Sequence, residues 1–548
     1  MKKTIYLSFN IRACLLCMLL LCAMLSLLLT SCGKCDHSNG LWVTEVEPTE
    51  DECGVEAWYC KNCGETYQKR EIPKLEKTAP DDADDPVLEE LAMELSEDGS
   101  SYTVAGIGTF RGEDLVIPQT YKNLPVVGIK PEAFDECTSI KTLHVPASIK
   151  TVSFQAFRDC TALERVVLAQ GVQEIDTAAF YGCIALREIT IPQSVTTIGL
   201  TVFEGCDRLI EVENGVQYVN DWVVGIDEQA TDGSITLRAN TVGIAKDSLS
   251  SPYVTSLVLN DGLKYINASA LSSTSITSLA IPSGVQSIKD AMQSSTSLEY
   301  LWISDTVTEV GYVHSQALKQ ILVDENNPAY GAFEGVLYTK DGKTLVQYPS
   351  AKEGTTFAIP SGVEQIGELA FYLSDFEEIS IPSSVHSIGA NAFSHARIKQ
   401  IAIASHVRSV GNNAFTYCRS LTEVQIGNGV KLGTGVFSYC DRLEILVLPN
   451  DLIAIGDYMF KGCTRLFGAD RWEIAEGITA IGNNVVDGWS ALREVYIPAS
   501  VTSISRAAFS GCNGLATIYY AGSEAEWNRI IADGGLLLPA SVQIVFGS

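Results

Sequence analysis

The apolar residues of this chain recur with a period of 22 or 23 residues over most of its length. An aromatic anchor marks each period, and the regular anchors are Phe134, Phe157, Phe180, Phe203, Phe371, Phe393, Phe415, Phe437 and Phe460. A unit of this length cannot bury its own apolar face, whereas stacked units share a continuous core. The period therefore predicts a repeat protein made of stacked coils.

Within each unit the apolar positions alternate in a way that predicts strands. An apolar-x-apolar triplet is often closed by proline, as in Ile189-Thr190-Ile191-Pro192, and a second apolar pair ends in glycine, as in Ile198-Gly199. Alternation points the apolar residues of a strand inward, and proline ends a ladder to which it cannot donate. We expect the glycine to permit the turn that follows and the phenylalanine to lie on a short helical or irregular segment. The fold class predicted is a β-rich solenoid of parallel strands, with about fifteen repeats between residues 120 and 520.

Several segments depart from the repeat. Residues 222–237 and 335–348 alternate like strand–turn–strand segments, the second with an Asp-Gly turn, and are predicted to be hairpins inserted between coils. The ends of a solenoid need caps. We expect residues 102–127 to cap the first coil and an amphipathic helix over 524–531 to cap the last.

Cysteine stands three residues after seven of these anchors and after a further one, Phe509, at Cys137, Cys160, Cys183, Cys206, Cys418, Cys440, Cys463 and Cys512. Coils stacked about 4.8 Å apart would bring such residues within the Cα separation of a disulfide. However, identical slots point their Cβ atoms the same way, and Trp489 occupies the equivalent place in its unit. We therefore expect buried free thiols, because cysteine suits a small, nearly apolar slot.

Composition narrows the classes of partner. Hydrophobic residues make up 46% of the chain and charged residues 19%, and the formal net charge is −28. Nucleic-acid binders need a clustered basic surface, so this balance argues against nucleic acid. It fits a soluble surface that keeps the protein dispersed.

The N-terminus carries a targeting signal. Lys2 and Lys3 precede an apolar run over 13–29, which ends in Leu29-Thr30-Ser31-Cys32. This tetrapeptide resembles a bacterial lipobox, which predicts removal of residues 1–31 and a lipid on Cys32. The alternative is an uncleaved transmembrane helix, since the run almost spans a bilayer. With a lipid anchor, the chain would contact the membrane only through Cys32 and lie outside the cytoplasm, at the cell surface or outer envelope.

A cysteine-rich segment over 32–78 follows. Its Cys-x-x-Cys-Gly turn is typical of a zinc knuckle, in which two thiolates sit on a tight bend. We expect one structural zinc, and its ligands would be Cys35, His37, Cys60 and Cys63. Cys53 could replace Cys35, and disulfides are the alternative in an oxidising exterior. A segment this short needs a staple of one kind or the other.

An acidic linker over 79–98 leads to the repeats, which would fill residues 99–548. The sequence contains no constellation typical of an enzyme. Five of the six histidines are scattered among the repeats, and neither a phosphate loop nor a Gly-x-Ser-x-Gly elbow is present. We therefore predict no catalysis.

Residues from about 99 to the end resemble the BspA-like leucine-rich-repeat surface proteins of bacteria. The resemblance rests on the Ala-Phe-x-x-Cys-x-x-Leu unit and on motifs at the opening, the insertion and the close of the repeats, which begin at Ser101, Glu334 and Tyr520. The segment over 32–78 is similar to zinc-ribbon modules found beside such repeats. The resemblance implies a right-handed solenoid and a role in adhesion to host proteins, host cells or other microbes.

The outward slots of the strands are where a partner would bind. Several are large and apolar beside charged neighbours, as binding surfaces tend to be. The candidate ligand-binding residues are Tyr300, Trp302, Leu322 and Tyr496. The alternative is that aromatic and β-branched residues simply favour strands. The predicted function is adhesion at the cell surface through binding of host or microbial proteins, and the partners expected are extracellular proteins or glycans. An accessory lipoprotein that captures glycans or peptides as nutrients, or a structural spacer in the envelope, is the alternative.

Overall fold

The computed structural model describes residues 40–46, 54–60, 66–72, 91–468, 470–539 and 541–547. The chain divides into two compact units, Met1–Pro86 and Val87–Ser548. Each unit is described by itself below.

The first unit contains a three-stranded antiparallel sheet in the order β1-β2-β3, formed by Gly40–Val46, Gly54–Cys60 and Thr66–Ile72. The start of β1 lies beside the end of β2, because Gly40 pairs with Cys60. The predicted signal peptide, the lipidation site Cys32 and the candidate zinc ligands Cys35, His37 and Cys63 lie outside the described residues. Of Cys60, only the backbone is described.

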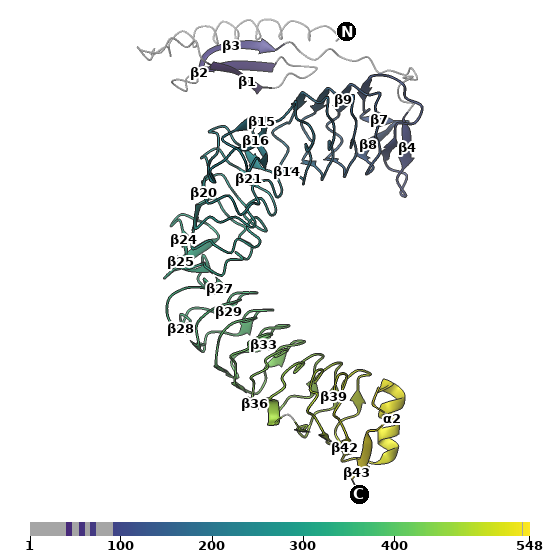
Figure 1. The fold of residues 1–548 in the computed structure, drawn as a ribbon, viewed down its shortest axis with the longest axis vertical. Coiled ribbons are helices and arrows are strands. Elements are labelled where there is room, and N and C mark those ends of the chain that lie inside the picture. The colour runs from purple at the N-terminus through teal and green to yellow at the C-terminus, as the bar shows by residue number, and fades with distance from the viewer. Residues whose placement is uncertain are drawn as a thin grey trace, which may run out of the picture. The chain divides into compact units, whose positions relative to one another are not determined.

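The second unit is a solenoid of parallel strands, which confirms the predicted fold class (Figure 1). Its described residues make about 19 turns, close to the repeat number predicted. We call the face built from the apolar-x-apolar triplets the first face. Its strands are β6 (Asp114–Val116), β9 (Thr142–Val145), β11 (Arg165–Leu168), β13 (Glu188–Thr190), β18 (Ser234–Thr236), β20 (Ser256–Val258), β22 (Ser278–Ala280), β23 (Tyr300–Ile303), β24 (Gln320–Val323), β28 (Thr356–Ala358), β30 (Glu378–Ser380), β32 (Gln400–Ile403), β34 (Glu423–Ile426), β36 (Ile445–Val447), β38 (Arg471–Glu473), β40 (Glu494–Ile497), β42 (Thr517–Tyr520) and β43 (Gln543–Phe546).

The second apolar pair of each unit forms a two-residue strand on a second face. These strands are β10 (Thr151–Val152), β12 (Glu174–Ile175), β14 (Thr197–Ile198), β19 (Gly243–Ile244), β21 (Tyr265–Ile266), β29 (Gln365–Ile366), β31 (Ser387–Ile388), β33 (Ser409–Val410), β35 (Lys431–Leu432), β37 (Ala454–Ile455), β39 (Ala480–Ile481) and β41 (Ser503–Ile504). On both faces the middle or final apolar residue is buried and its neighbours are more exposed, as alternation predicts.

The anchor phenylalanines lie on turns, not on the short helices that were one of the two expectations. The turn around Phe393 shows the reason, because Asn391 has φ 53° and His395 has φ 62°. Two left-handed residues within five positions are incompatible with an α-helix of L-residues. The anchors nevertheless stack as predicted: the ring centres of Phe134, Phe157, Phe180 and Phe203 follow one another at 4.9, 5.6 and 6.1 Å.

The glycine that ends the second apolar pair has a different role from the one predicted. Gly199, Gly367 and Gly389 do not have positive φ, so no turn conformation requires glycine there. A Cβ on Gly199 would instead lie 2.4 Å from the backbone nitrogen of Thr177 in the preceding coil. These glycines therefore allow adjacent coils to approach each other closely.

Two antiparallel hairpin insertions interrupt the solenoid. The first is formed by β15 (Glu211–Glu213), β16 (Val216–Val219) and β17 (Trp222–Ile226), and the second by β25 (Tyr330–Phe333), β26 (Val336–Thr339) and β27 (Thr344–Gln347). The second matches the prediction, with its Asp-Gly turn between β26 and β27. The hairpin predicted over 222–237 is wrong: β17 pairs with β16, whereas β18 pairs in parallel with β20. Within 222–237, apolar and polar residues alternate on both sides of the predicted turn. Alternation predicts that a segment is a strand, but it does not predict with which strand that segment pairs.

Both ends of the repeat array carry other elements. The N-terminal cap is a sheet of β4 (Ala92–Leu95), β5 (Tyr102–Gly106), β8 (Leu124–Ile129) and β7 (Thr120–Tyr121). Because β4 pairs with β5, residues 92–95 of the predicted linker belong to this cap. At the other end α2 (Glu524–Gly534) buries Trp527 and Ile530, and a capping box between Ser523 and Glu526 begins it, as the predicted helix requires. A single 3-10 turn, η1 (Leu466–Gly468), precedes β38.

The buried side chains of the solenoid form three clusters. The first runs from Leu91 to Ala245, the second from Val216 to Leu337 and the third from Val336 to Leu536. The boundaries between clusters fall at the two hairpin insertions. No helix within the described residues is long and apolar enough to cross a membrane.

Candidate binding surfaces

Three of the four candidate ligand-binding residues lie together on the first face. Trp302 on β23 pairs with Leu322 on β24, and Tyr300 lies two residues before Trp302 on the same side of its strand. Tyr300 and Trp302 are each 43% exposed, and Leu322 is half-buried. We call Tyr300, Trp302 and Leu322 the central aromatic patch.

The central aromatic patch has an apolar extension and a charged rim. On the other side of Trp302 lies Ala280, and the equivalent slot of β20 holds Val258, which is 55% exposed. At the rim, the Nζ of Lys319 lies 2.8 Å from the Oε2 of Glu299, and this ion pair raises the pKa of Lys319. An apolar row bounded by paired charges is the arrangement expected of a protein-binding surface.

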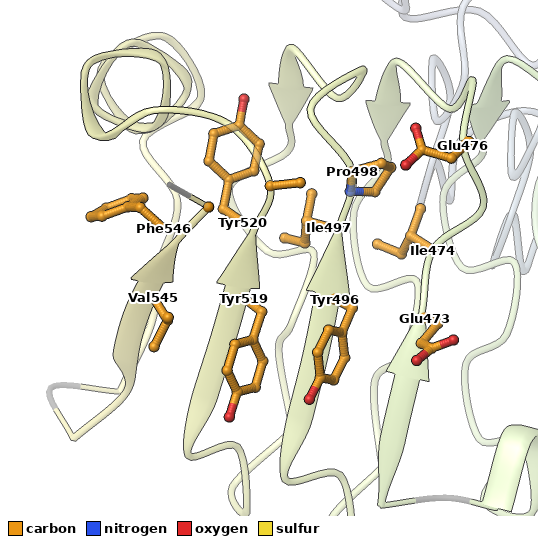
Figure 2. A pocket seen from close by; sticks show the side chains of 12 residues that line it. Glu473, Ile474, Glu476, Tyr496, Ile497, Pro498, Tyr519, Tyr520, Val545 and Phe546 are labelled. Atoms are coloured by element: carbon orange, nitrogen blue, oxygen red, sulfur yellow. The ribbon is translucent and has the colours of Figure 1, made fainter.

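Tyr496, the fourth candidate, belongs to a separate site on β40, where its neighbours Val495 and Ile497 are part of the third cluster. It lines a groove of about 390 Å³ together with Tyr519, Val545 and Phe546 on the next two strands (Figure 2). Figure 2 shows Glu473, Tyr496, Tyr519 and Val545 in one row across neighbouring strands. We call this the C-terminal tyrosine groove.

The ring of Tyr496 is already covered on both sides. Its centre lies 4.4 Å from that of Tyr519 in a stacked pair, and the guanidinium of Arg471 lies 4.0 Å from its centre. Its hydroxyl donates to Glu494 over 3.1 Å, and burial, followed by this hydrogen bond, raises the pKa of Tyr496. Because these contacts occupy both ring faces, Tyr496 offers a ligand mainly its edge. The central aromatic patch is the better candidate for a hot spot.

The repeat cysteines contribute to the packing of the solenoid interior. All eight are free, and all but Cys137 are buried, as predicted. The Sγ of Cys160 donates a hydrogen bond to the carbonyl oxygen of Phe134 in the preceding coil, 3.1 Å away. Burial raises the pKa of Cys512 to about 12, and a thiol with such a pKa is a poor nucleophile at neutral pH. Among the described residues no group of three or more His, Cys, Asp or Glu could hold a metal ion.

Two features were missed at the sequence level. A ladder of rings runs along the anchor turns, where His395, Tyr417 and Tyr439 stack at 4.7 and 4.5 Å. Their 22-residue spacing would have revealed it. The second feature is a hollow of about 460 Å³ at the first hairpin insertion, between Thr197 and Tyr265. No local motif could have revealed it, because its walls come from segments about 70 residues apart.

Comparisons with known proteins agree with this architecture. The family model for the BspA type leucine rich repeat region matches in six copies, over residues 114–223, 229–321, 350–467 and 430–528. No curated protein matches the chain. Among solved structures, a leucine rich cell surface protein from Faecalibacterium prausnitzii A2-165 is 24% identical, covering 80% of this chain and 96% of its own, with a TM-score of 0.29. A leucine-rich repeat protein from Eubacterium ventriosum ATCC 27560 is 20% identical (84% and 91% covered, TM-score 0.35). The pneumococcal vaccine antigen PcpA is 16% identical (83% and 99% covered, TM-score 0.36).

Proposed function

The chain belongs to the BspA-type leucine-rich-repeat family, and from this premise we propose that it is a cell-surface binding protein that attaches to extracellular proteins of a host or of other microbes. A solenoid presents a long row of equivalent outward positions, and such surfaces bind extended partners. The proposal includes no catalytic step, since the groups described above supply packing and contact area.

The central aromatic patch is the observation that supports this proposal best. A tryptophan and a tyrosine with 43% of their surface exposed lie beside a leucine on a rigid parallel sheet. Rigid aromatic side chains supply contact area at a small cost in conformational entropy, and they are enriched among binding hot spots. Strand propensity explains why a single aromatic residue occurs in a strand. It does not explain why large apolar residues occupy adjacent outward positions on neighbouring strands.

The test is a triple substitution, Tyr300→Ser, Trp302→Ser and Leu322→Ser. The wild-type chain is first screened on an array of extracellular matrix proteins and bacterial surface proteins. The affinity for each protein that binds is then compared between variants. We expect the triple variant to bind at least tenfold more weakly, about 1.4 kcal/mol, with an unchanged melting temperature, because the substituted side chains project from the sheet.

A matched control is available on β34, where Glu423→Ser and Gln425→Ser alter the equivalent slots of a strand without an aromatic residue. This control should bind like the wild type. If the triple variant binds with unchanged affinity, the central aromatic patch is not the binding site. The C-terminal tyrosine groove and the inserted hairpins are then the candidates. Absence of binding to every protein on the array would contradict the function itself.

We further propose that a lipid on Cys32 holds the protein at the membrane. The lipobox-like sequence supports this proposal, and acyl chains contribute about 0.8 kcal/mol per buried CH₂ group. Wild type and Cys32→Ala should therefore partition differently between detergent and water. Equal partitioning would exclude the anchor.

The remaining proposal concerns one zinc ion held by Cys35, His37, Cys60 and Cys63. The pairing of Gly40 with Cys60 supports this proposal, because it brings the start of β1 next to the end of β2. All four proposed ligands are close in the sequence to one of these two strand ends. Three thiolates and an imidazole suit zinc. Metal analysis of the whole chain should give one equivalent, which Cys60→Ser with Cys63→Ser removes. Disulfides among these cysteines in mass spectrometry would contradict zinc.

A further inference from the structure

The first hairpin insertion produces a step in the second face of the solenoid. The sheet β10-β12-β14 stops at β14, and a new sheet, β15-β16-β17-β19-β21, begins with the hairpin. The amide side chain of Asn267 bridges the step. Its Oδ1 accepts from the nitrogen of Ile198 at 2.9 Å, and its Nδ2 donates to the carbonyl of Thr196 at 3.0 Å. The side chain of Asn267 thus forms the hydrogen bonds with Thr196 and Ile198 that the backbone of a neighbouring strand would otherwise form.

The step leaves a hollow of about 460 Å³ between the two sheets. Thr196 and Thr197 form one wall, Lys264 and Tyr265 another, and Gln286 part of a third. Its volume lies within the range of about 300–1,000 Å³ that is usual for small-ligand sites. The Asn267 bridge fixes the two main walls relative to each other, so the site is formed before any ligand arrives.

An aromatic wall separates this hollow from a second one. The rings of Trp222 and Tyr265 lie 5.8 Å apart and are parallel within 3°. They approach because Gly243 stands between them in the ladder, where a Cβ would lie 2.4 Å from the Trp222 ring. The second hollow, of about 130 Å³, also contains Lys264 and Tyr265 in its lining and adds Gln193, Asn220 and the carboxylate of Asp221. Two hollows that share a wall suit a ligand made of linked units.

The chemistry of the lining identifies the ligand class. The larger hollow has hydroxyl and amide groups, one cation and no carboxylate, although the chain as a whole has a net charge of −28. A cationic ligand would find no counter-charge in the larger hollow, and the carboxylate of Asp221 in the smaller one already accepts a hydrogen bond from Asn240. One lysine is too little for a polyanion. Hydroxyls and amides both donate and accept, as the hydroxyls of a sugar do, and an aromatic ring packs against the apolar face of a sugar.

From these observations we propose that the step at the first hairpin insertion binds a neutral oligosaccharide of at least two sugar units, with Tyr265 as the stacking platform. This site is separate from the central aromatic patch and does not depend on the protein-binding function proposed above.

The experiment uses the full-length protein and an array of neutral oligosaccharides, namely xylo-, manno-, cello- and N-acetylglucosamine oligomers, beside sialylated and sulfated glycans and unrelated peptides. Neutral oligomers that bind are then titrated by calorimetry against the variants. Tyr265→Ala should lower the affinity at least tenfold, whereas Tyr265→Phe retains the ring and should retain most of the affinity. Lys264→Ala with Gln286→Ala should also weaken binding, and these two exposed side chains can be removed without opening the core.

Gln365→Ala is the matched control, because Gln365 occupies on β29 the slot that Tyr265 occupies on β21 and is exposed. It should bind like the wild type, as should the triple variant of the central aromatic patch. The proposal is overturned by an array without neutral binders, by binding confined to anionic glycans or peptides, or by an affinity that Tyr265→Ala and the Lys264–Gln286 double variant both leave unchanged.

Discussion

At the residue scale, the buried cysteines three positions after the anchors each donate a hydrogen bond to the preceding coil. Cys463 donates to the carbonyl oxygen of Phe437 at 2.9 Å, in the same way as the other buried repeat cysteines. Two residues that replace cysteine keep the donor: the indole nitrogen of Trp489 donates to the carbonyl of Phe460 at 2.9 Å, and the hydroxyl of Ser295 to that of Leu271 at 3.0 Å. The slot does not require a donor, because Ala396 follows Phe393 and the hydroxyl of Ser374, which follows Phe371, has no partner.

This role of the slot predicts an order of stability among variants of Cys463. Cys463→Ala leaves the Phe437 carbonyl without its donor and opens a small cavity, so it should lower the free energy of unfolding by about 1–3 kcal/mol. Cys463→Ser keeps a donor and should cost less. The melting temperatures of the two variants, measured by circular dichroism, check this order. If serine is as harmful as alanine, volume and not hydrogen bonding defines the slot.

The sequence predicted the burial of these thiols but not their bonds. Burial follows from an apolar periodicity, which is visible in one dimension. A hydrogen bond to the preceding coil depends on the stacking distance and on the direction of a carbonyl, which are properties of two coils together. The replacement of cysteine by Trp489 and Ser295, which share only a donor, was the available signal.

At the element scale, the coils stack closely because glycines end the short strands of the second face. A Cβ on Gly389 would lie 2.6 Å from the nitrogen of Glu368 and 2.7 Å from the carbonyl carbon of Gly367. Gly411 approaches the backbone of Gly389 in the same way. The sequence pattern located these glycines correctly and suggested a turn as their purpose, because a contact with the coil before is not visible within a single repeat.

The close approach predicts the effect of Gly389→Ala. The added methyl group meets backbone atoms that cannot rotate away, so the two coils must separate, and overpacking of this kind costs about 1–3 kcal/mol. We expect a lower melting temperature. Gly362→Ala is the matched control, since no atom lies within 4 Å of the Cβ position and φ is not positive there. Equal melting temperatures for the two variants would show that the coils yield without cost.

At the scale of the whole molecule, the repeats and caps of the second unit could be predicted from the sequence, whereas the candidate sites could be predicted only in part. The central aromatic patch was predictable, because its residues occupy equivalent slots of adjacent repeats. Tyr496 was predicted as a candidate together with the patch because it occupies the equivalent outward position of its strand. Tyr496 lies about 170 residues further along the chain than the patch, on a strand that covers another buried cluster. The step at the first insertion was not predictable, since it arises from the way in which a hairpin displaces β14 from the ladder.

The two insertions also divide the solenoid into three hydrophobic clusters, and this division predicts how it unfolds. Near the second insertion, the joint relies on polar contacts: Gln347 bonds to both backbone groups of Val313, at 3.0 and 2.9 Å, and the hydroxyl of Tyr312 donates to the carbonyl of Tyr372 at 2.9 Å. Polar bonds of this kind each contribute only about 0.5–1.5 kcal/mol. In a repeat protein stability is nearly a sum over neighbouring units, so weak joints should let segments open separately.

Hydrogen exchange with mass spectrometry in increasing urea tests this division. Amides of the third cluster, over 348–536, should lose protection at a urea concentration different from those of the first, over 104–206. Gly389→Ala, which lies inside the third cluster, should lower the midpoint of that segment and leave the midpoint of the first unchanged. Gly362→Ala again serves as the control and should shift neither. If Gly389→Ala lowers all midpoints together, the insertions transmit stability as well as an unbroken core would, and the solenoid unfolds as a single cooperative unit.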